Sequence, residues 1–297
     1  MIDLRKVFSS DFRGKMMYAL KFLPDKIYLN LFYFSTTGRF INFKNPKGFN
    51  EKQQWLKVND RRPEYTKLVD KLAVREHIDS VLGEGHLFPL LGKWESFDDV
   101  DFSTLPNQFV LKCNHDSGST KVIKDKSALT QKDFDEMKIF FSRRLSHDFF
   151  YAGREYPYKG IKPCIIAEQL MVDEKNPEKS IEDYKFFCFN GVPKVMFVAT
   201  DRSIDCRFDF FDMEFNHLDI FNIHPNADKP IKKPELFDEM KDIAAKLSQG
   251  MKFVRIDLYE LNGRIYFGEY TFFHGGGFQL FSPPKWERKL GDWLDIS

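Results

Sequence analysis

Two Asn-Gly dipeptides constrain the fold of this chain more than any other feature, because each lies between two runs with the composition of β-strands. Asn190-Gly191 separates DYKFFCF from VPKVMFVAT, and Asn262-Gly263 follows KFVRIDLY and precedes RIYFGEYT. Asn and Gly tolerate the left-handed backbone that tight hairpin turns require. The sequence therefore predicts β-hairpins, and with them antiparallel sheets, rather than a parallel sheet with helical crossovers.

The rest of the chain divides into three zones of different texture. Residues 1–95 are expected to be mainly helical, residues 106–200 are rich in strand patterns, and residues 201–297 mix helix with strand. Few clean βαβ units are present, so the predicted fold class is α+β. We expect a helical N-terminal region over 1–95 and a second unit over 96–297, with subdomains at about 106–170 and 171–297.

Helix signals are clearest at three places. Thr130, with Asp133 three residues later, has the pattern of a capping box. Pro234 is expected to open a later helix that Gly250 ends. A third helical pattern stops at Gly83. Its apolar residues are Tyr65, Leu68, Val69, Leu72, Ala73, Ile78, Val81 and Leu82.

Composition excludes several classes of protein. Lys plus Arg is 45 and Asp plus Glu is 44, so the basic excess typical of a nucleic-acid binder is missing. No apolar run is long enough to span a bilayer. The weakly amphipathic N-terminus, with Arg13, Lys15 and Lys21 on its polar side, allows peripheral membrane contact but more often packs on its own domain. The four cysteines show no metal-ligand spacing, so reduced thiols in a cytoplasmic protein are expected.

The second hairpin carries the residues best suited to metal chemistry. Asp257 and Glu269 lie on its two strands, with a hydroxyl at Thr271 and a guanidinium at Arg255. Carboxylate and hydroxyl oxygens suit Mg²⁺, and a planar, permanently charged guanidinium suits a phosphate. An ordinary ion pair on a solvated strand face explains these residues about equally well when they are taken alone.

The register of this hairpin decides whether the two carboxylates meet. A two-residue turn pairs Leu261 with Arg264 and sends the carboxylates to opposite faces. A three-residue loop pairs Glu260 with Arg264 instead and gathers the polar side chains. We favour the three-residue loop for that reason. The residues on the shared face are then Arg255, Asp257, Glu269 and Thr271.

A second notable run joins a lysine in an apolar strand to a glycine-bearing loop. Lys112 lies in FVLKC, and a lysine there is costly without an anionic partner such as phosphate. The loop that follows contains Ser117, Gly118 and Ser119, and such loops present backbone N–H groups to phosphate oxygens. An edge-strand lysine followed by a surface turn is the plainer interpretation of this run alone.

Taken in order, seven runs of the chain resemble the ATP-grasp superfamily, and most closely its TupA-like branch, which is associated with teichuronopeptide and capsular polysaccharide synthesis. The runs are FNEKQQWLK, DKLAVR, FVLKCNHDSG, IIAEQL, DYKFFCFNG, FVRIDLY and FGEYTF, and they span about residues 49–272. The resemblance implies an ATP-grasp fold, with two α+β subdomains that clasp ATP and Mg²⁺.

The resemblance also implies a role for each matching position. Lys112 and Arg75 are expected to face nucleotide phosphates, and the loop from His115 to Thr120 to close over them. Glu168 matches an acid beside adenine and ribose. Asp183 matches a ribose-contacting acid, with Lys185 beside it. The implied Mg²⁺ ligands are Asp257, Glu269 and Thr271, and Arg255 resembles the arginine that stabilises the transferred phosphoryl group.

The chain departs from the superfamily pattern at two places. Thr271 stands where an asparagine is usual, although a hydroxyl can still ligate Mg²⁺. The usual Rossmann-like N-terminal domain is not evident in residues 1–95, which leaves the acceptor pocket open. Related ligases bind substrate where this chain has His274, Gly275 and Gly276.

The activity that the resemblance implies is ATP-dependent joining of a carboxylate to an amine through an acyl phosphate. A uronic-acid carboxylate and an amino acid are the substrates that this branch suggests. The protein is expected to work in the cytoplasm or at the inner face of the membrane. Two alternatives stay open, a glycosyltransferase that uses the D-x-D triplet Asp99-Val100-Asp101 and a sugar phosphotransferase. A non-catalytic binding module is disfavoured, because Asp257 and Glu269 are both present. The acceptor, the amine and the oligomeric state are not encoded in any motif.

Overall fold

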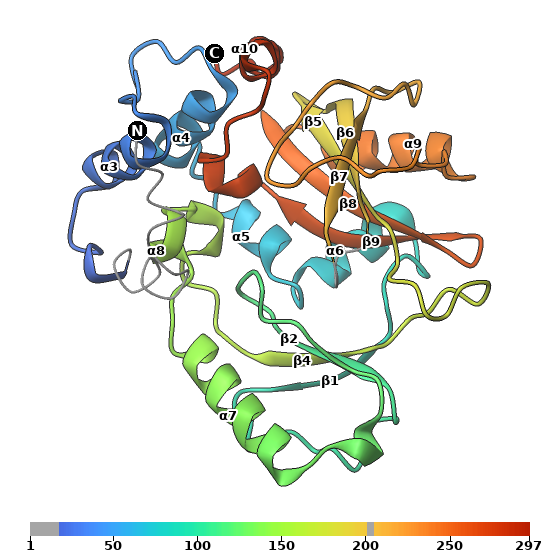
Figure 1. Ribbon diagram of the computed structural model, residues 1–297. Coiled ribbons are helices and arrows are strands. Elements are labelled where there is room, and N and C mark those ends of the chain that lie inside the picture. The colour runs from blue at the N-terminus through green and yellow to red at the C-terminus, as the bar shows by residue number, and fades with distance from the viewer. Residues whose placement is uncertain (1–17, 201–204) are drawn as a thin grey trace.

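The computed structural model describes residues 18–200 and 205–297, and Figure 1 shows how their elements are arranged. Two antiparallel sheets form the framework. A smaller sheet lies at the bottom of the view beside a long helix, and a larger sheet lies above it, with the N-terminal helices along one side. The predicted α+β class is confirmed.

Among the described residues, several helices lie before the first strand. They are α3 (Asp25–Thr37), α4 (Phe49–Asn59), α5 (Glu64–Val69) and α6 (Val74–Leu82). α4 packs against the last helix of the chain, α10 (Pro284–Trp293), where Gly291 lies so close to the backbone near Gly48 that a Cβ would be 2.3 Å from the carbonyl oxygen of Lys47.

The continuous helical pattern predicted between Tyr65 and Leu82 is wrong, because the chain turns at Asp70. The backbone of Asp70 is extended, at φ −73° and ψ 111°, and its carboxylate accepts the N–H groups of Leu72 and Ala73. The same carboxylate also accepts from the side chain of Asn114 in the smaller sheet. A side-chain acceptor close in sequence thus replaces one turn of helix.

The smaller sheet has the strand order β1-β4-β2-β3. Its strands are β1 (Leu90–Trp94), β2 (Phe109–Cys113), β3 (Lys121–Ile123) and β4 (Ile165–Gln169). One face packs on α7 (Gln131–Leu145), whose Thr130 cap and Asp133 partner were predicted and are confirmed. Because β1 belongs to this sheet, we propose that the second unit begins near residue 90 rather than at 96. The short helical turns that follow α7 are α8 (Phe150–Gly153) and residues 156–158.

The larger sheet has the strand order β7-β6-β5-β8-β9. Its strands are β5 (Asp183–Phe189), β6 (Val192–Thr200), β7 (Arg207–Phe211), β8 (Phe253–Leu261) and β9 (Arg264–Thr271). The helix α9 (Phe237–Leu247) packs on one face and contributes to the main hydrophobic core. It begins after Pro234 as expected, but Ser248 rather than Gly250 caps it.

Both Asn-Gly hairpins are present. Asn190 and Gly191 have φ of 51° and 81°, and the corresponding values at Asn262 and Gly263 are 51° and 73°. Leu261 pairs with Arg264, so the turn of the second hairpin has two residues, and the three-residue loop that we predicted is wrong. Mirror-image turns of this kind match the twist of the strands that they join.

A bulge at Gly268 changes the register further along the same hairpin. Leu258 pairs with Phe267, but the next pair is Asp257 with Glu269, which leaves Gly268 without a partner. The extra residue turns the end of β9 by one position, so that Glu269 faces the same side of the sheet as Asp257. The shared polar face was therefore predicted correctly, although the physical cause is a bulge and not the loop length.

Candidate active site

A buried row of charges crosses three strands of the larger sheet on the face away from α9. Lys185 of β5 lies opposite Asp257 of β8, and its Nζ contacts that carboxylate and, at 2.5 Å, the carboxylate of Asp183. Arg255 holds both oxygens of Asp257, with Nε–Oδ1 at 2.6 Å and a second bond to Oδ2 at 2.7 Å. The structure thus brings together the predicted residues of these two strands.

The row continues to β9 through the same guanidinium. Arg255 lies 3.4 Å from the carboxylate of Glu269 and donates at 3.0 Å to the hydroxyl of Thr271. The side chain of Glu269 is 34% exposed, whereas that of Asp257 is 1% exposed. Although burial alone would raise it, the charges of Arg255 and Lys185 bring the pKa of Asp257 down to about 2. This row therefore consists of a buried ion-pair network around Asp257 and one partly exposed carboxylate, that of Glu269.

His274 extends the network to the C-terminal side of β9. Its Nδ1 lies 2.9 Å from a nitrogen of Arg255, and its Nε2 lies 2.7 Å from the side-chain oxygen of Asn222. A guanidinium can only donate, so Nδ1 accepts and Nε2 carries the proton that it gives to Asn222. Burial, and then the charge of Arg255, lowers the pKa of His274 well below its usual value. His274 is therefore a neutral positioning group for Arg255.

Two cations and one acid come together on the smaller sheet and the helix α6 beside it. Lys112 of β2 lies 2.5 Å from the carboxylate of Glu168 on β4, and Arg75 of α6 lies 3.5 Å from its other oxygen. Arg75 also donates to the carbonyl of Phe88 at 2.8 Å. Lys112 and Glu168 point away from α7, because the alternate residues of their strands form the core beneath that helix.

Lys71 is a further cation near both groups of charges, and the sequence analysis did not single it out. It lies in the turn between α5 and α6, and its Nζ donates to the carbonyl of Asp116. Burial lowers the pKa of Lys71, Lys112 adds to the lowering, and Glu269 opposes it. Lys71 is therefore close enough to feel a charge from each sheet. Lys71 belongs to the run DKLAVR, which the sequence analysis used, but only Arg75 of that run was given a role.

The loop after β2 is fastened at several points. Arg144 of α7 lies 2.5 Å from the carboxylate of Asp116 and also donates to the carbonyl of Ser117. The Ser119 hydroxyl accepts from the N–H of Cys113 at 2.9 Å and donates to Asp116. Gly118 supplies the left-handed residue, at φ 82°. The predicted loop thus lies between α7 and Lys71, beside Lys112.

The turn His274–Gly277, which we call the glycine turn, has three glycines with positive φ. A buried lysine of α4 supports it, since Lys57 donates to the carbonyls of Gly276 at 2.6 Å and of Gly153 at 2.7 Å. Gln54 donates to the carbonyl of Gly277 at 2.6 Å. Sequence reasoning missed Lys57 and Gln54, because their partners are more than ninety residues away in the chain.

Mg²⁺ fits this site with oxygens supplied by more than the protein. Within residues 18–200 and 205–297, no group of three or more His, Cys, Asp and Glu side chains is arranged to hold a metal. Glu269 and Thr271 offer open oxygens, and Asp257 lies opposite Glu269 in the pairing. Mg²⁺ in nucleotide sites usually takes one or two carboxylates and completes its octahedron with phosphate and water oxygens. The donor set fits that pattern.

The D-x-D triplet lies outside this site. Asp101 accepts from the N–H of Ser103 at 3.0 Å and from its hydroxyl at 2.6 Å, and Val100 is buried in the core under α7. The carboxylates of Asp99 and Asp101 therefore stabilise a turn. Their bonds are those of a local cap and do not support the nucleotide-sugar interpretation.

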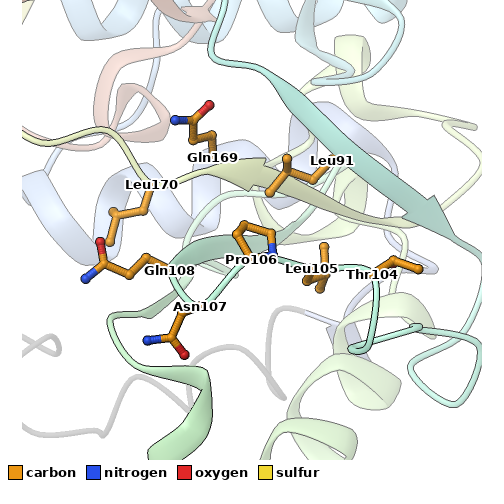
Figure 2. Close-up of a pocket in the computed structure, with 8 residues that line it drawn as sticks. All are labelled: Leu91, Thr104, Leu105, Pro106, Asn107, Gln108, Gln169 and Leu170. Carbon is orange, nitrogen blue, oxygen red and sulfur yellow. The ribbon is translucent and has the colours of Figure 1, made fainter.

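A pocket of about 740 Å³ follows this turn at the edge of the smaller sheet (Figure 2). Its lining residues are Leu91, Thr104, Leu105, Pro106, Asn107, Gln108, Gln169 and Leu170. Gln169 follows Glu168 directly and pairs with Phe109, whose side chain is in the core under α7. The lining holds no charged side chain, so this pocket is not suited to a pyrophosphate.

The structure thus carries Lys112 and Glu168 on the smaller sheet and the Arg255–Asp257–Glu269 row on the larger one, where the resemblance to the ATP-grasp class of ATP-dependent ligases led us to look for a site. The model of TupA-like ATP-grasp proteins matches residues 51–295. The chain therefore belongs to the TupA-like ATP-grasp family.

Solved structures with a similar fold include D-alanine–D-alanine ligase from Bacillus anthracis complexed with ATP, at 15% identity and a TM-score of 0.38, where the match covers 69% of this chain and 53% of that one. They also include the ATP-grasp ligase PsnB complexed with minimal precursor, at 12% identity and a TM-score of 0.43, with 81% and 65% covered. The chain thus spans about half to two thirds of these structures. No curated protein matches it.

Proposed function

We propose that this chain is an ATP- and Mg²⁺-dependent carboxylate–amine ligase of cell-surface polysaccharide biosynthesis, which joins an amino acid to a uronic-acid carboxylate of a small-molecule or saccharide substrate. One observation carries the proposal. On one side, Glu168 is the shared ion-pair partner of Arg75 and Lys112, and Lys71 adds a third cation, while the carboxylate of Glu269 is partly exposed on the other side. A polyanion with a divalent cation complements both sides.

The triphosphate is assigned to the cationic side. Lys112 and Arg75 now neutralise Glu168, and phosphate oxygens would compete for the same two cations. Lys71 adds a third charge from the turn between α5 and α6. The loop residues Ser117, Gly118 and Ser119 would cover the phosphates, and Glu168 with Asp183 and Lys185 would contact the nucleoside. These roles follow the family pattern, and the contacts above are consistent with them.

Mg²⁺ is assigned to Glu269 and Thr271, with Asp257 opposite them. When bound, it would offset phosphate charge during transfer. Arg255 lies within 3.4 Å of Glu269, and its other hydrogen bonds to Asp257 and His274 fix the position of the guanidinium. A guanidinium fixed on three sides would stabilise the charge on a transferring phosphoryl group without having to reorganise.

The proposed reaction has two displacements. A carboxylate oxygen of the acceptor bonds to the γ-phosphorus of ATP, the bond from that phosphorus to the bridging oxygen breaks, and ADP leaves. An amine nitrogen then bonds to the carbonyl carbon, phosphate leaves with the electron pair of its C–O bond, and the nitrogen loses a proton to give the amide. The carboxylate needs no base in the first step, so the protein mainly positions the reactants and neutralises charge.

The acceptor is assigned to the end of the site at the glycine turn. Gly275 and Gly276 lack side chains beside His274, which itself contacts Arg255. A carboxylate there would lie next to the group proposed to assist phosphoryl transfer. We place this activity in the cytoplasm, at the inner face of the membrane, because polysaccharide precursors are built there. No helix of the described residues is long and apolar enough to cross a bilayer.

Calorimetry with ATP and Mg²⁺ tests the nucleotide site on the intact chain and on Lys112→Ala and Glu269→Ala. We expect binding by the intact chain and at least about tenfold weaker binding by each variant. Lys132→Ala is the matched control, because that lysine pairs with Glu136 on the exposed surface of α7. Tight binding of a nucleotide-sugar in place of ATP would overturn the ligase proposal.

A screen for ADP release with uronic acids and amino acids then tests the reaction. The ligase proposal requires that product formation depends on both the carboxylate and the amine. Hydroxylamine should trap an acyl phosphate as a hydroxamate when the amine is left out. A stable phosphorylated sugar formed without any amine would show a phosphotransferase instead.

A further inference from the structure

The helix α3 is apolar on both sides, although the described residues cover only one of them. Tyr28, Leu29 and Tyr33 are buried in a small core with Ile41. On the opposite side, Ile27, Leu31 and Phe34 follow one another at helical spacing and are 51%, 48% and 46% exposed. A surface helix usually carries polar residues on that side, so this uncovered side calls for an explanation.

The exposed apolar surface continues beyond both ends of the helix. Phe22 precedes α3 and is 75% exposed, and Phe40 follows it and is 65% exposed. The rings of Phe34 and Phe40 stack at 4.7 Å, which joins the end of the helix to the segment after it. We call Phe22, Ile27, Leu31, Phe34 and Phe40 the α3 stripe. Ile27, Leu31 and Phe34 share one side of the helix and Phe40 stacks on Phe34, so these four form one apolar surface, and Phe22 adds an exposed ring just before the helix.

Basic residues accompany the α3 stripe in the sequence. The chain as a whole is nearly neutral, with 45 basic and 44 acidic residues. Residues 18–48, however, contain five basic residues and one acid, Asp25. Asp25 is occupied, because it pairs with Arg61 and Arg154. The basic residues are Lys21, Lys26, Arg39, Lys44 and Lys47. One further acid, Glu51, accepts from the N–H groups of Asn42, Lys47 and Gly48, so the segment keeps a net positive charge in a protein without a general basic excess.

We propose that the α3 stripe docks the protein on a lipid bilayer with anionic headgroups. An apolar row flanked by lysine and arginine is the pattern of a helix that lies in the membrane interface, with its rings among the acyl chains and its cations at the phosphates. A second copy of the chain fits this surface less well, because a symmetric contact would bring the two sets of basic residues together.

A series of hydrogen bonds connects α3 with the glycine turn, and it indicates which part of the site docking would place near the bilayer. Tyr28 donates to the carbonyls of Tyr151 and Ala152 at 3.2 Å, and Arg154 donates to three carbonyls just before α3. The next carbonyl, that of Gly153, accepts from Lys57, which also holds Gly276. In Figure 1, α3 and α8 lie on the same side of the molecule as α4.

Docking through α3 would therefore bring the acceptor end of the site toward the bilayer. A saccharide carried on a membrane lipid is then the class of acceptor that the surface favours. This last step rests on the proposed function, whereas the docking itself does not. The two can fail separately, because vesicle binding requires neither ATP nor an acceptor.

Vesicle co-sedimentation of the full chain tests the docking surface. The probes are vesicles of phosphatidylcholine alone and vesicles in which about a third of the lipid is phosphatidylglycerol. We expect binding to the anionic vesicles that weakens with salt. The variant Ile27→Gln/Leu31→Gln/Phe34→Gln should bind at least about tenfold more weakly. The variant Lys21→Gln/Lys26→Gln/Arg39→Gln should lose the salt dependence and most of the binding.

The control is Ile139→Gln, since Ile139 of α7 is 70% exposed and lies away from the α3 stripe. It should bind anionic vesicles like the unmodified chain. The proposal is overturned if the unmodified chain does not sediment with anionic vesicles. It is equally overturned if the apolar variant Ile27→Gln/Leu31→Gln/Phe34→Gln binds those vesicles as well as the unmodified chain does. It is also overturned if that variant has a clearly lower melting temperature, which would mean that the stripe is covered within the protein. A dimer in sedimentation equilibrium that the variant abolishes would assign the surface to a second copy.

Discussion

Asp257 and Glu269 face each other across β8 and β9 because Gly268 is left out of the pairing. Without that bulge, the two-residue turn at Asn262-Gly263 would place the carboxylates on opposite faces of the sheet. The candidate Mg²⁺ site thus depends on one unpaired glycine. Its neighbours are tight, since a Cβ on Gly268 would lie 2.9 Å from the ring of Tyr259 and 3.1 Å from the carbonyl oxygen of Asp257.

Gly268→Ala should therefore weaken Mg²⁺-dependent ATP binding. The added methyl group meets a backbone oxygen that cannot move without moving Asp257 itself. We expect a loss of about 1–3 kcal/mol in the free energy of unfolding and at least about tenfold weaker binding. Urea unfolding and calorimetry measure the two effects. Gly263→Ala is the control, because it strains only the turn, at φ 73°, and should lose stability without losing nucleotide affinity.

The two facing carboxylates should respond differently to neutralisation. Asp257→Asn leaves Arg255 and Lys185 buried without their shared partner, so we expect a loss of about 3–5 kcal/mol in the free energy of unfolding. Glu269→Gln changes a partly exposed group and should leave the unfolding midpoint almost unchanged. It should nevertheless lower ADP release by a factor on the order of 10² or more. Equal destabilisation by both variants would contradict the assignment of Glu269 as the open ligand.

Local signals in the sequence predicted the elements that depend on neighbours in the chain. The Thr130 cap and both Asn-Gly turns are settled within a few residues, and each is present in the structure. The helix break at Asp70 was missed because it depends partly on Asn114, which is 44 residues away. The bulge at Gly268 was missed because a pattern of alternating side chains does not show where one residue drops out of register.

In the candidate site too, features set by the local sequence were predicted and features set by distant contacts were not. The charged residues of β8 and β9 were found because alternation along a hairpin can be seen in sequence. Lys57 was not found, because a lysine whose helical neighbours are Gln53, Gln54 and Asp60 is typical of a solvated face, and nothing nearby predicts its burial among distant carbonyls and rings. Supporting contacts of this kind are set by tertiary packing.

His274 should make the stability of the protein depend on pH. Its neighbours Arg255, Lys185 and Asp257 surround a buried ring whose pKa is lowered well below 6.5, so the folded ring stays neutral where the unfolded one takes up a proton. Stability is therefore fully present above pH 6.5 and falls as the pH drops further. His274→Gln should reduce this slope by at most about 1.4 kcal/mol per pH unit.

Urea unfolding at pH 5, 6, 7 and 8 measures that slope. The control is His217→Gln, because His217 is half exposed and its contact with Asp209 lies away from Arg255. That variant should retain the slope attributed to His274. An unchanged slope in His274→Gln would mean that the ring is protonated in the folded protein, and that Arg255 is held in another way.

Lys57→Met tests whether the buried lysine positions the glycine turn. Methionine fills most of the volume between the rings of Phe273 and Phe278 but donates nothing to the carbonyls of Gly153 and Gly276. The Gly153 carbonyl loses the donor that Lys57 supplies, and the Gly276 carbonyl keeps only Gln54 at 3.1 Å, which should cost about 1–3 kcal/mol in the free energy of unfolding. We also expect faster hydrogen exchange over residues 273–278, while the affinity for ATP stays within about twofold, because Lys57 touches none of the groups assigned to the phosphates.

Lys52→Met is the matched control for this variant. Lys52 lies on the same helix and also donates to two carbonyls, those of Gly291 and Leu294, but they belong to the C-terminal end of the chain. It should lose similar stability and leave exchange at the glycine turn unchanged. If Lys57→Met and Lys52→Met gave the same exchange pattern, Lys57 would be a structural lysine only. If Lys57→Met alone loosened the turn, raised the KM for the acceptor and spared that for ATP, the path from α4 to the acceptor end would be established.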